Sequence, residues 1–348
     1  MKNKIYRLLS CIVVICMLIG MFSVSQFILR PNETDQCKAN IKAFHELPEN
    51  SLDVIFFGSS HGWRGIDPLQ MYEDYGIGAY NYGGNWQKLS TEALFVHDAI
   101  RTQKPKVVAI ETYRINKVIE DQNMDGEIYY TKAMSNFPYK QEYLKKAFGN
   151  ELERYVAYYF PFSQLHSSWN TLNSENFHVW YKPEDFLKTM GYFNIPTGKK
   201  VQSVEITDPA TQEQKKLSEG AVEILNELVA TCKENDIELL FYSIPCEGDF
   251  NYDAAMEKYA AENDCTYIDL YDYNDEIGLN QDEDYMDAGH LNFYGVQKVS
   301  DFMGKYLKDN YELEDKRQVP GNIWEGKYGY VMGQNKEDWK AKQKSTEE

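Results

Sequence analysis

Two short segments at opposite ends of this 348-residue chain contain the residue types of nucleophilic catalysis. Ser59 and Ser60 directly follow an apolar run and a glycine, and Asp287 precedes His290 by three residues. A serine hydroxyl is a weak nucleophile at neutral pH and needs a base. A carboxylate can orient a histidine whose other ring nitrogen faces the serine, as in a Ser-His-Asp triad. Together the segments predict acyl transfer through a serine.

Each of these residues also has an ordinary structural explanation. Serines placed after a strand often cap the following helix, and a carboxylate such as Asp287 is favourable near the start of a helix. The combination of both segments, each after an expected strand, favours catalysis over separate structural roles. His61 is expected to point away from Ser60, because neighbours on a tight turn diverge, and we treat it as a candidate substrate contact.

A parallel sheet would bring the two segments together at one edge. Helical spacing between apolar runs, as in the segment 221–232, alternates with short runs typical of buried strands. Such alternation predicts a parallel sheet with helices on both faces. We therefore expect an α/β, doubly wound, flavodoxin-like fold of about five strands. The expected strands are 54–57, 79–82, 106–110, 237–244 and 266–270.

The motif Gly58-Ser59-Ser60-His61 after the first strand, with Asp287-x-x-His290 before the last helix, resembles the first and last blocks of the SGNH (GDSL-like) hydrolase superfamily. The resemblance covers about residues 53–307 and implies that Ser60 is the nucleophile and Asp287 and His290 its base system. The doubled serine, an apolar N-terminus and a long central insertion resemble the DltD-like (D-alanyl-lipoteichoic acid biosynthesis protein) surface acyl-transfer group.

The resemblance also implies an oxyanion hole. Its expected donors are the backbone of Ser60, a glycine after the second strand, for which Gly84 is favoured over Gly83, and Asn85. The Gly-x-Asn-Asp block of the superfamily is absent after the third strand, where the segment 111–116 stands instead. This departure favours the divergent acyl-transfer branch over the plain hydrolases.

A rival interpretation comes from the same first block. The segment 58–62 also satisfies Gly-x-Ser-x-Gly, the nucleophile elbow of α/β-hydrolases. That fold requires several strands before its elbow, whereas only one expected strand precedes Ser60. The close Asp-x-x-His pair also differs from the separated acid and histidine of that class, so we favour the SGNH interpretation.

The N-terminus predicts a membrane anchor. Lys2, Lys4 and Arg7 precede a mostly apolar run over residues 8–29, and about 20 apolar residues span a bilayer as a helix. The basic flank predicts a cytoplasmic N-terminus and an extracytoplasmic body, in a single-pass protein of the cell membrane. A cleaved signal peptide, with a small-residue site at 23–25, is the alternative.

The rest of the chain divides by composition. After the anchor at 1–30, we expect a polar linker with one short helix at 31–50 and an α/β domain at 51–310. The aromatic-rich stretch 113–216 lacks a strand–helix repeat and is expected to form a mainly helical insertion, either a lid or an extra packing layer. We assign no function to the charged tail 311–348.

Charge and cysteine usage restrict the functional classes. A net charge of −18 repels polyanions, so we expect no nucleic-acid partner. Four scattered cysteines outside the apolar run form neither a disulfide framework nor a zinc motif. The acidic run 272–284 lacks the pattern of a calcium loop. We therefore expect no metal and no cofactor.

The sequence thus predicts an extracytoplasmic serine esterase or O-acyltransferase. The resemblance implies that it acts on acyl esters of a cell-surface glycan or teichoic-type polymer, with a membrane-bound O-acyltransferase as a partner. Release of the acyl group to water or to an acceptor hydroxyl is left open. The alternative is a noncatalytic surface binding or assembly module on an SGNH scaffold, which the altered third block supports.

Overall fold

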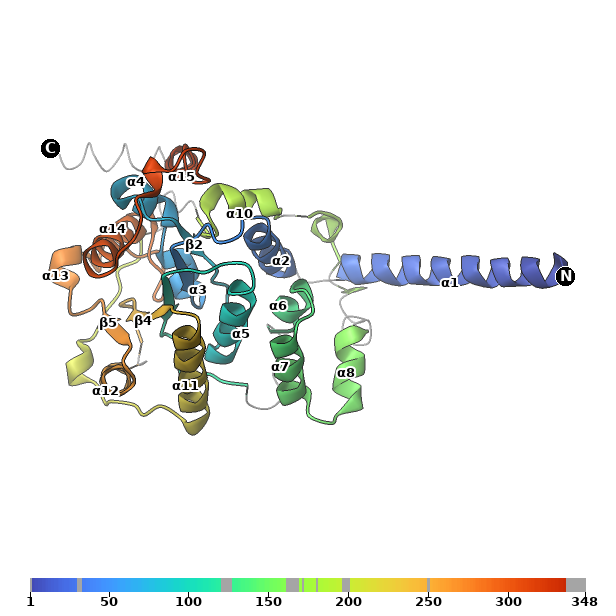
Figure 1. The fold of residues 1–348 in the computed structure, drawn as a ribbon, viewed down its shortest axis with the longest axis horizontal. Helices are drawn as coiled ribbons and strands as arrows, with labels where there is room; N and C mark the ends of the chain where they lie inside the picture. The colour runs from blue at the N-terminus through green and yellow to red at the C-terminus, as the bar shows by residue number, and fades with distance from the viewer. Residues whose placement is uncertain are drawn as a thin grey trace.

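A five-stranded parallel sheet forms the centre of the molecule, and a long N-terminal helix projects away from it (Figure 1). The computed structural model describes residues 2–29, 33–119, 127–160, 169–170, 172–179, 181–195, 201–248 and 251–335. The observed class is the α/β, doubly wound arrangement that the alternation of apolar runs predicts. Every element that the text names below lies in these ranges.

The strands are arranged in the order β2-β1-β3-β4-β5, and each neighbouring pair is parallel. Side chains of β1 and β3 are buried along their whole length, which explains their continuous apolar sequences. Phe57 pairs with Ile110, so both strands end at the same edge. The strands are β1 Val54–Phe57, β2 Ala79–Asn81, β3 Val107–Glu111, β4 Glu238–Ser243 and β5 Thr266–Asp269.

Helices cover both faces of the sheet. In Figure 1, α4 and α14 lie on one side and α5 and α11 on the other, and each of these pairs is packed together. Short helices α3 and α13 follow β1 and β5, and α12 packs on β5. The bounds are α3 Ser60–Gly65, α4 Pro68–Tyr75, α5 Leu89–Ala99, α11 Glu219–Glu234, α12 Asp253–Asn263, α13 Asn274–Ile277 and α14 Phe293–Asn310.

The expected insertion is helical where the structure describes it. Helix α7 packs on α5, and α6 and α10 pack on the helix α2 (Glu33–His45). Residues 120–126, 161–168 and 196–200, together with 171 and 180, lie outside the described part. The helices are α6 Glu127–Ala133, α7 Pro138–Phe148, α8 Leu152–Tyr159 and α10 Pro183–Thr189, with the 3-10 helices η2 Ser174–Phe177 and η3 Pro209–Thr211.

Two segments that composition assigned to a linker and a tail belong to the folded body. Helix α2 fills most of the expected linker, and its Ile41 and Phe44 are buried in the main core. In the tail, Trp324 is buried and its Nε1–H donates to the Ala79 carbonyl oxygen at 2.9 Å. Composition alone does not distinguish these segments from a linker and a tail, and packing identifies them as parts of the body. The tail also contains η4 Lys316–Gln318 and α15 Tyr328–Gln334.

Helix α1 (Lys2–Leu29) contains the apolar N-terminal run. Its stretch Lys4–Leu29 is long and apolar enough to cross a membrane. Most of its side chains are exposed in the isolated chain.

Candidate active site

Ser60 lies at the first position of α3, directly beyond the carboxyl end of β1. Ser59 is the N-cap of that helix, and its side chain accepts the His61 N–H at 3.4 Å. A side chain at Gly58 would place a Cβ 2.6 Å from the Cβ of Glu111, so only glycine allows this approach of the turn to β3. The turn therefore presents the partly exposed Ser60 side chain at the edge of the sheet.

The loop before α14 brings the predicted base system to this serine. The Oγ of Ser60 and the Nε2 of His290 are 2.8 Å apart, and the Nδ1 of His290 is 2.8 Å from the Oδ1 of Asp287. The same carboxylate oxygen accepts the N–H groups of Gly289 and His290, each at 2.9 Å. The three residues predicted from the sequence thus form one continuous hydrogen-bonded chain, with the carboxylate held by the loop backbone.

The surroundings favour the protonation states that a base system needs. Burial lowers the pKa of His290 below 6.5, and the positive charge of Arg64 lowers it further, against the opposing effect of Asp287. Burial raises the pKa of Asp287, but the donated N–H groups and the imidazole outweigh it and bring this pKa below 3.8. Near neutral pH the histidine is therefore neutral and the carboxylate ionised.

The predicted oxyanion donors are only partly available. The Gly84 N–H donates to the Gly58 carbonyl oxygen at 3.0 Å, and the Gly83 N–H to the Asn81 side chain at 3.2 Å. In contrast to the expectation, the Gly84 N–H is not available to stabilise an oxyanion in this arrangement. The loop after β2 approaches the nucleophile turn closely, and this N–H is already donated to the turn. The Asn85 amide donates one hydrogen to Gln36 at 3.3 Å, which leaves its second hydrogen.

Glu111 is a site residue that the motif search missed. Its Oε2 accepts the Ser59 hydroxyl at 2.9 Å, and its Oε1 accepts the Tyr113 N–H. Burial raises the pKa of this carboxyl to about 7, although the hydrogen bonds from Tyr113 and Ser59 act in the opposite direction. An acidic residue at the end of an otherwise apolar strand is the sequence signal that could have identified it.

Arg64 is the second missed residue. It follows Ser60 by four positions, so the two lie on the same face of α3. Its Nη2 donates to the Asn85 Oδ1 at 2.9 Å, and its guanidinium carbon lies 5.6 Å from the centre of the Phe193 ring. Its buried Nε has no hydrogen-bond partner within the described ranges. Arg64 therefore provides positive charge beside the base system.

His61 lies against the base system instead of pointing away from it. Its ring centre is 5.1 Å from that of His290, and the ring stacks on Tyr113 at 3.6 Å. Burial lowers the pKa of His61 to about 3, and His290 and Arg64 act in the same direction. This neutral, buried imidazole forms part of the wall of the site and adds no charge to it.

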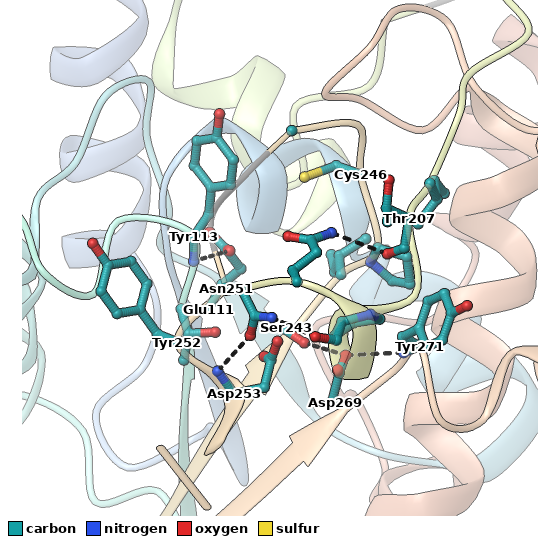
Figure 2. A pocket seen from close by; sticks show the side chains of 17 residues that line it. Glu111, Tyr113, Thr207, Ser243, Cys246, Asn251, Tyr252, Asp253, Asp269 and Tyr271 are labelled. Atoms are coloured by element: carbon teal, nitrogen blue, oxygen red, sulfur yellow. Dashed lines mark hydrogen bonds between the residues drawn. The ribbon is translucent and has the colours of Figure 1, made fainter. Parts of the chain in front are cut away.

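A pocket of about 70 Å³ with a mixed polar and apolar lining lies near the nucleophile turn, although Ser60, Asp287 and His290 are not among its lining residues (Figure 2). Residues that follow β3, β4 and β5 form its walls, together with parts of the segments 206–212 and 251–253. Glu111 and Tyr113 belong both to this lining and to the surroundings of the turn. The labelled side chains in Figure 2 are Glu111, Tyr113, Thr207, Ser243, Cys246, Asn251, Tyr252, Asp253, Asp269 and Tyr271.

Within the described ranges, no group of three or more His, Cys, Asp and Glu side chains is placed to hold a metal ion. The chemistry that the arrangement itself offers is that of an activated serine: a partly exposed hydroxyl, a neutral imidazole and an ionised carboxylate in line.

Comparisons with known proteins do not assign the chain to a family. No family model matches the chain, and no curated protein matches it in sequence. Among solved structures, it is similar to a protein of Bacteroides fragilis described as a "putative acylhydrolase". The two share 11% sequence identity at a TM-score of 0.37, and the similarity covers 77% of this chain and 93% of the other.

Proposed function

We propose that this chain is a serine esterase or acyltransferase of the SGNH type, in which Ser60 carries the acyl group. The observation that supports it most is the hydrogen-bonded chain from Ser60 through His290 to Asp287, with 2.8 Å at each step. The nucleophile and its base are within hydrogen-bond reach, and a third group orients the base, which is the geometry of an activated nucleophile.

In the first half-reaction, the Oγ of Ser60 attacks the carbonyl carbon of an acyl ester. The Nε2 of His290 takes the hydroxyl proton and then gives it to the departing alcohol oxygen. Asp287 keeps the proton of the other ring nitrogen in place and stabilises the imidazolium that forms transiently. The products are an alcohol and an acyl ester on Ser60.

The second half-reaction regenerates the serine. Water or an acceptor hydroxyl loses a proton to His290 and attacks the acyl carbon, and His290 returns the proton to Ser60 as the acyl bond breaks. The Ser60 N–H and the second hydrogen of the Asn85 amide are the oxyanion donors in this proposal. Arg64 adds positive charge near the developing negative charge.

The adjoining pocket supports a small, hydrophilic group in the substrate. Its walls include the carboxyl groups of Asp253 and Asp269 and the hydroxyl of Ser243, and its volume is about 70 Å³. Ser243 donates to Asp269 at 2.6 Å within the protein, but a long acyl chain would still displace water from these carboxyl groups, at a cost in binding free energy. A short acyl group or a sugar hydroxyl fits this lining better.

The location completes the proposal. With α1 spanning the membrane and the basic residues Lys4 and Arg7 on the cytoplasmic side, the body lies outside the cell membrane. The acceptor is then a surface glycan or teichoic-type polymer, with a membrane-bound O-acyltransferase as a partner. These partners follow from the sequence resemblance and the apolar helix.

One observation favours a second candidate, a noncatalytic binding or assembly module on the same scaffold. The Gly84 N–H is committed to the Gly58 carbonyl oxygen, so one of the expected oxyanion donors is missing. A weakened oxyanion hole slows acyl transfer by about 100- to 1000-fold, whereas a binding module needs no activated serine at all.

Covalent labelling by a fluorophosphonate separates the two candidates. The full chain in detergent should label in the wild type and in Ser59→Ala, because the Ser59 hydroxyl faces Glu111 and not His290. Ser60→Ala should abolish labelling, and His290→Ala should reduce it strongly. A folded wild-type chain that resists the probe would favour the binding module, and equal labelling of Ser60→Ala would disprove the assignment of the nucleophile.

A further inference from the structure

Helix α8 exposes an apolar stripe. Leu152, Val156 and Tyr159 are spaced by four and three residues, so they lie on one face of the helix, and Phe160 follows directly. Their exposed fractions are 74%, 47%, 56% and 57% in that order. The opposite face of the helix packs on the body, where Tyr155 and Tyr158 contact Phe148. The exposed side of α8 is therefore largely apolar, with the exposed Glu153 at its margin, three residues before Val156.

This stripe lies beside the membrane helix. The rings of Phe160 and Phe22 are 6.0 Å apart, and η2, which contains the 58% exposed Phe177, also contacts α1. Figure 1 shows α8 next to the end of α1 that joins the body. In α1, Phe22, Gln26 and Leu29 lie on one face and are partly or fully covered. The last two turns of the helix thus pack against the insertion.

The length of α1 determines how deep in the bilayer this contact lies. Its apolar run extends over residues 8–29, which at about 1.5 Å per residue is about 33 Å, against a hydrocarbon thickness of about 30 Å. Leu29 therefore emerges by only a few ångströms. Phe22 lies seven residues earlier, about 10 Å deeper along the axis. A helix that contacts Phe22 cannot lie clear of the bilayer.

We propose that the outer face of α8, with Phe177 of η2, is a membrane-docking surface that lies in the outer lipid interface beside α1. We call this surface the α8 face, formed by Leu152, Val156, Tyr159, Phe160 and Phe177. Interfacial helices bury their apolar side about 5 to 10 Å into the boundary between head groups and acyl chains. Tyrosine is enriched at that level of the bilayer, and Phe and Leu are typical of the apolar face of interfacial helices; the α8 face contains one Tyr, two Phe and one Leu.

Lipid fits the α8 face better than a charged partner does. None of its five side chains is charged, and the exposed Glu153 at its margin, like the net charge of −18, opposes attraction to an anionic surface. Docking then depends on apolar burial and on the anchor, which keeps the surface at the membrane at all times. The contact needs no second protein.

Docking would also fix the distance between the candidate active site and the membrane surface. Gln36 follows Leu29 by seven residues, a reach of at most about 25 Å, and it accepts a hydrogen bond from Asn85 at 3.3 Å. Asn85 in turn accepts one from Arg64 of α3. The nucleophile helix is therefore held near the membrane surface. This consequence rests on the proposed function, and it restricts substrates to acyl groups and acceptors that are presented at the membrane.

A tryptophan placed on the α8 face tests the docking directly. The full chain carrying Val156→Trp is incorporated into nanodiscs of phosphatidylcholine, with either ordinary or brominated acyl chains. Emission of the wild-type chain is subtracted to isolate the added residue. We expect the brominated lipid to quench the added emission, because bromine quenches indole only in its close neighbourhood. A second variant, Tyr159→Trp, should respond in the same way.

Two matched variants define the range of the signal. Leu18→Trp in the middle of α1 should be quenched if the helix spans the disc, and Glu257→Trp on the exposed side of α12 should not. Quenching of Leu18→Trp without quenching at positions 156 and 159 would overturn the proposal, as would the absence of quenching at all three positions. The discs contain no other protein, and fluorophosphonate labelling of the same discs reports on Ser60 independently.

Discussion

Replacing Glu111 with glutamine should remove one defined contribution to the pH dependence of stability. Burial raises the pKa of this carboxyl from 4.5 to about 7 in the folded chain. In the unfolded chain it titrates near 4.5. Between these values the native state holds a proton that the unfolded state has lost, so stability falls as the pH rises from about 4.5 through 7. Glutamine does not titrate, and its contribution is constant.

The size of the effect follows from the shift. A difference of about 2.5 pH units, at about 1.4 kcal/mol per unit, corresponds to about 3 kcal/mol. The side chain is 1% exposed, so solvent screening reduces this little. Domains typically have about 5 to 15 kcal/mol of stability, which makes the change measurable. The substitution also replaces one acceptor oxygen by an NH₂ group, which can then face a donor such as the Tyr113 N–H. This lost hydrogen bond costs about 1 to 3 kcal/mol of stability, a cost that does not vary with pH.

Urea unfolding of the full chain in detergent, followed by tryptophan fluorescence at pH 5 and pH 8, measures this. The difference in unfolding free energy between wild type and Glu111→Gln should shift by about 2.5 kcal/mol between the two pH values, in favour of the variant at pH 8. Glu257→Gln makes the same chemical change on an exposed side chain and should show no such shift. An equal difference at both pH values would refute the reasoning.

Two further predictions concern the base system. Asp287→Asn should lower the rate of fluorophosphonate labelling by about 10⁴-fold, because the amide no longer selects the right tautomer of His290. The fold should be unchanged by circular dichroism, and a loss of labelling rate below tenfold would contradict the assigned role. Arg64→Gln should move the acid limb of the labelling rate to higher pH, because Arg64 lowers the pKa of His290 and the base must be neutral; an unmoved limb in a pH series would show that Arg64 does not act on His290.

The sequence alone was sufficient for what depends on local pattern. Continuous apolar runs between helical segments identified the strands, because a strand buried on both faces admits few polar side chains. The order of these runs placed Ser60 and the loop of Asp287 and His290 at strand carboxyl ends. Parallel strands share one carboxyl edge, so residues 230 positions apart become neighbours.

Tertiary packing decided what depends on contacts between distant segments. Whether Gly84 can serve an oxyanion depends on the distance from its N–H to the Gly58 carbonyl oxygen, which the approach of two loops sets. The role of Glu111 likewise depends on the register of β1 and β3, which places its carboxyl under Ser59. The α8 face appears only once the opposite side of that helix is packed on Phe148. Local sequence specifies the elements, but hydrogen bonds and burial between elements exist only in the assembled fold.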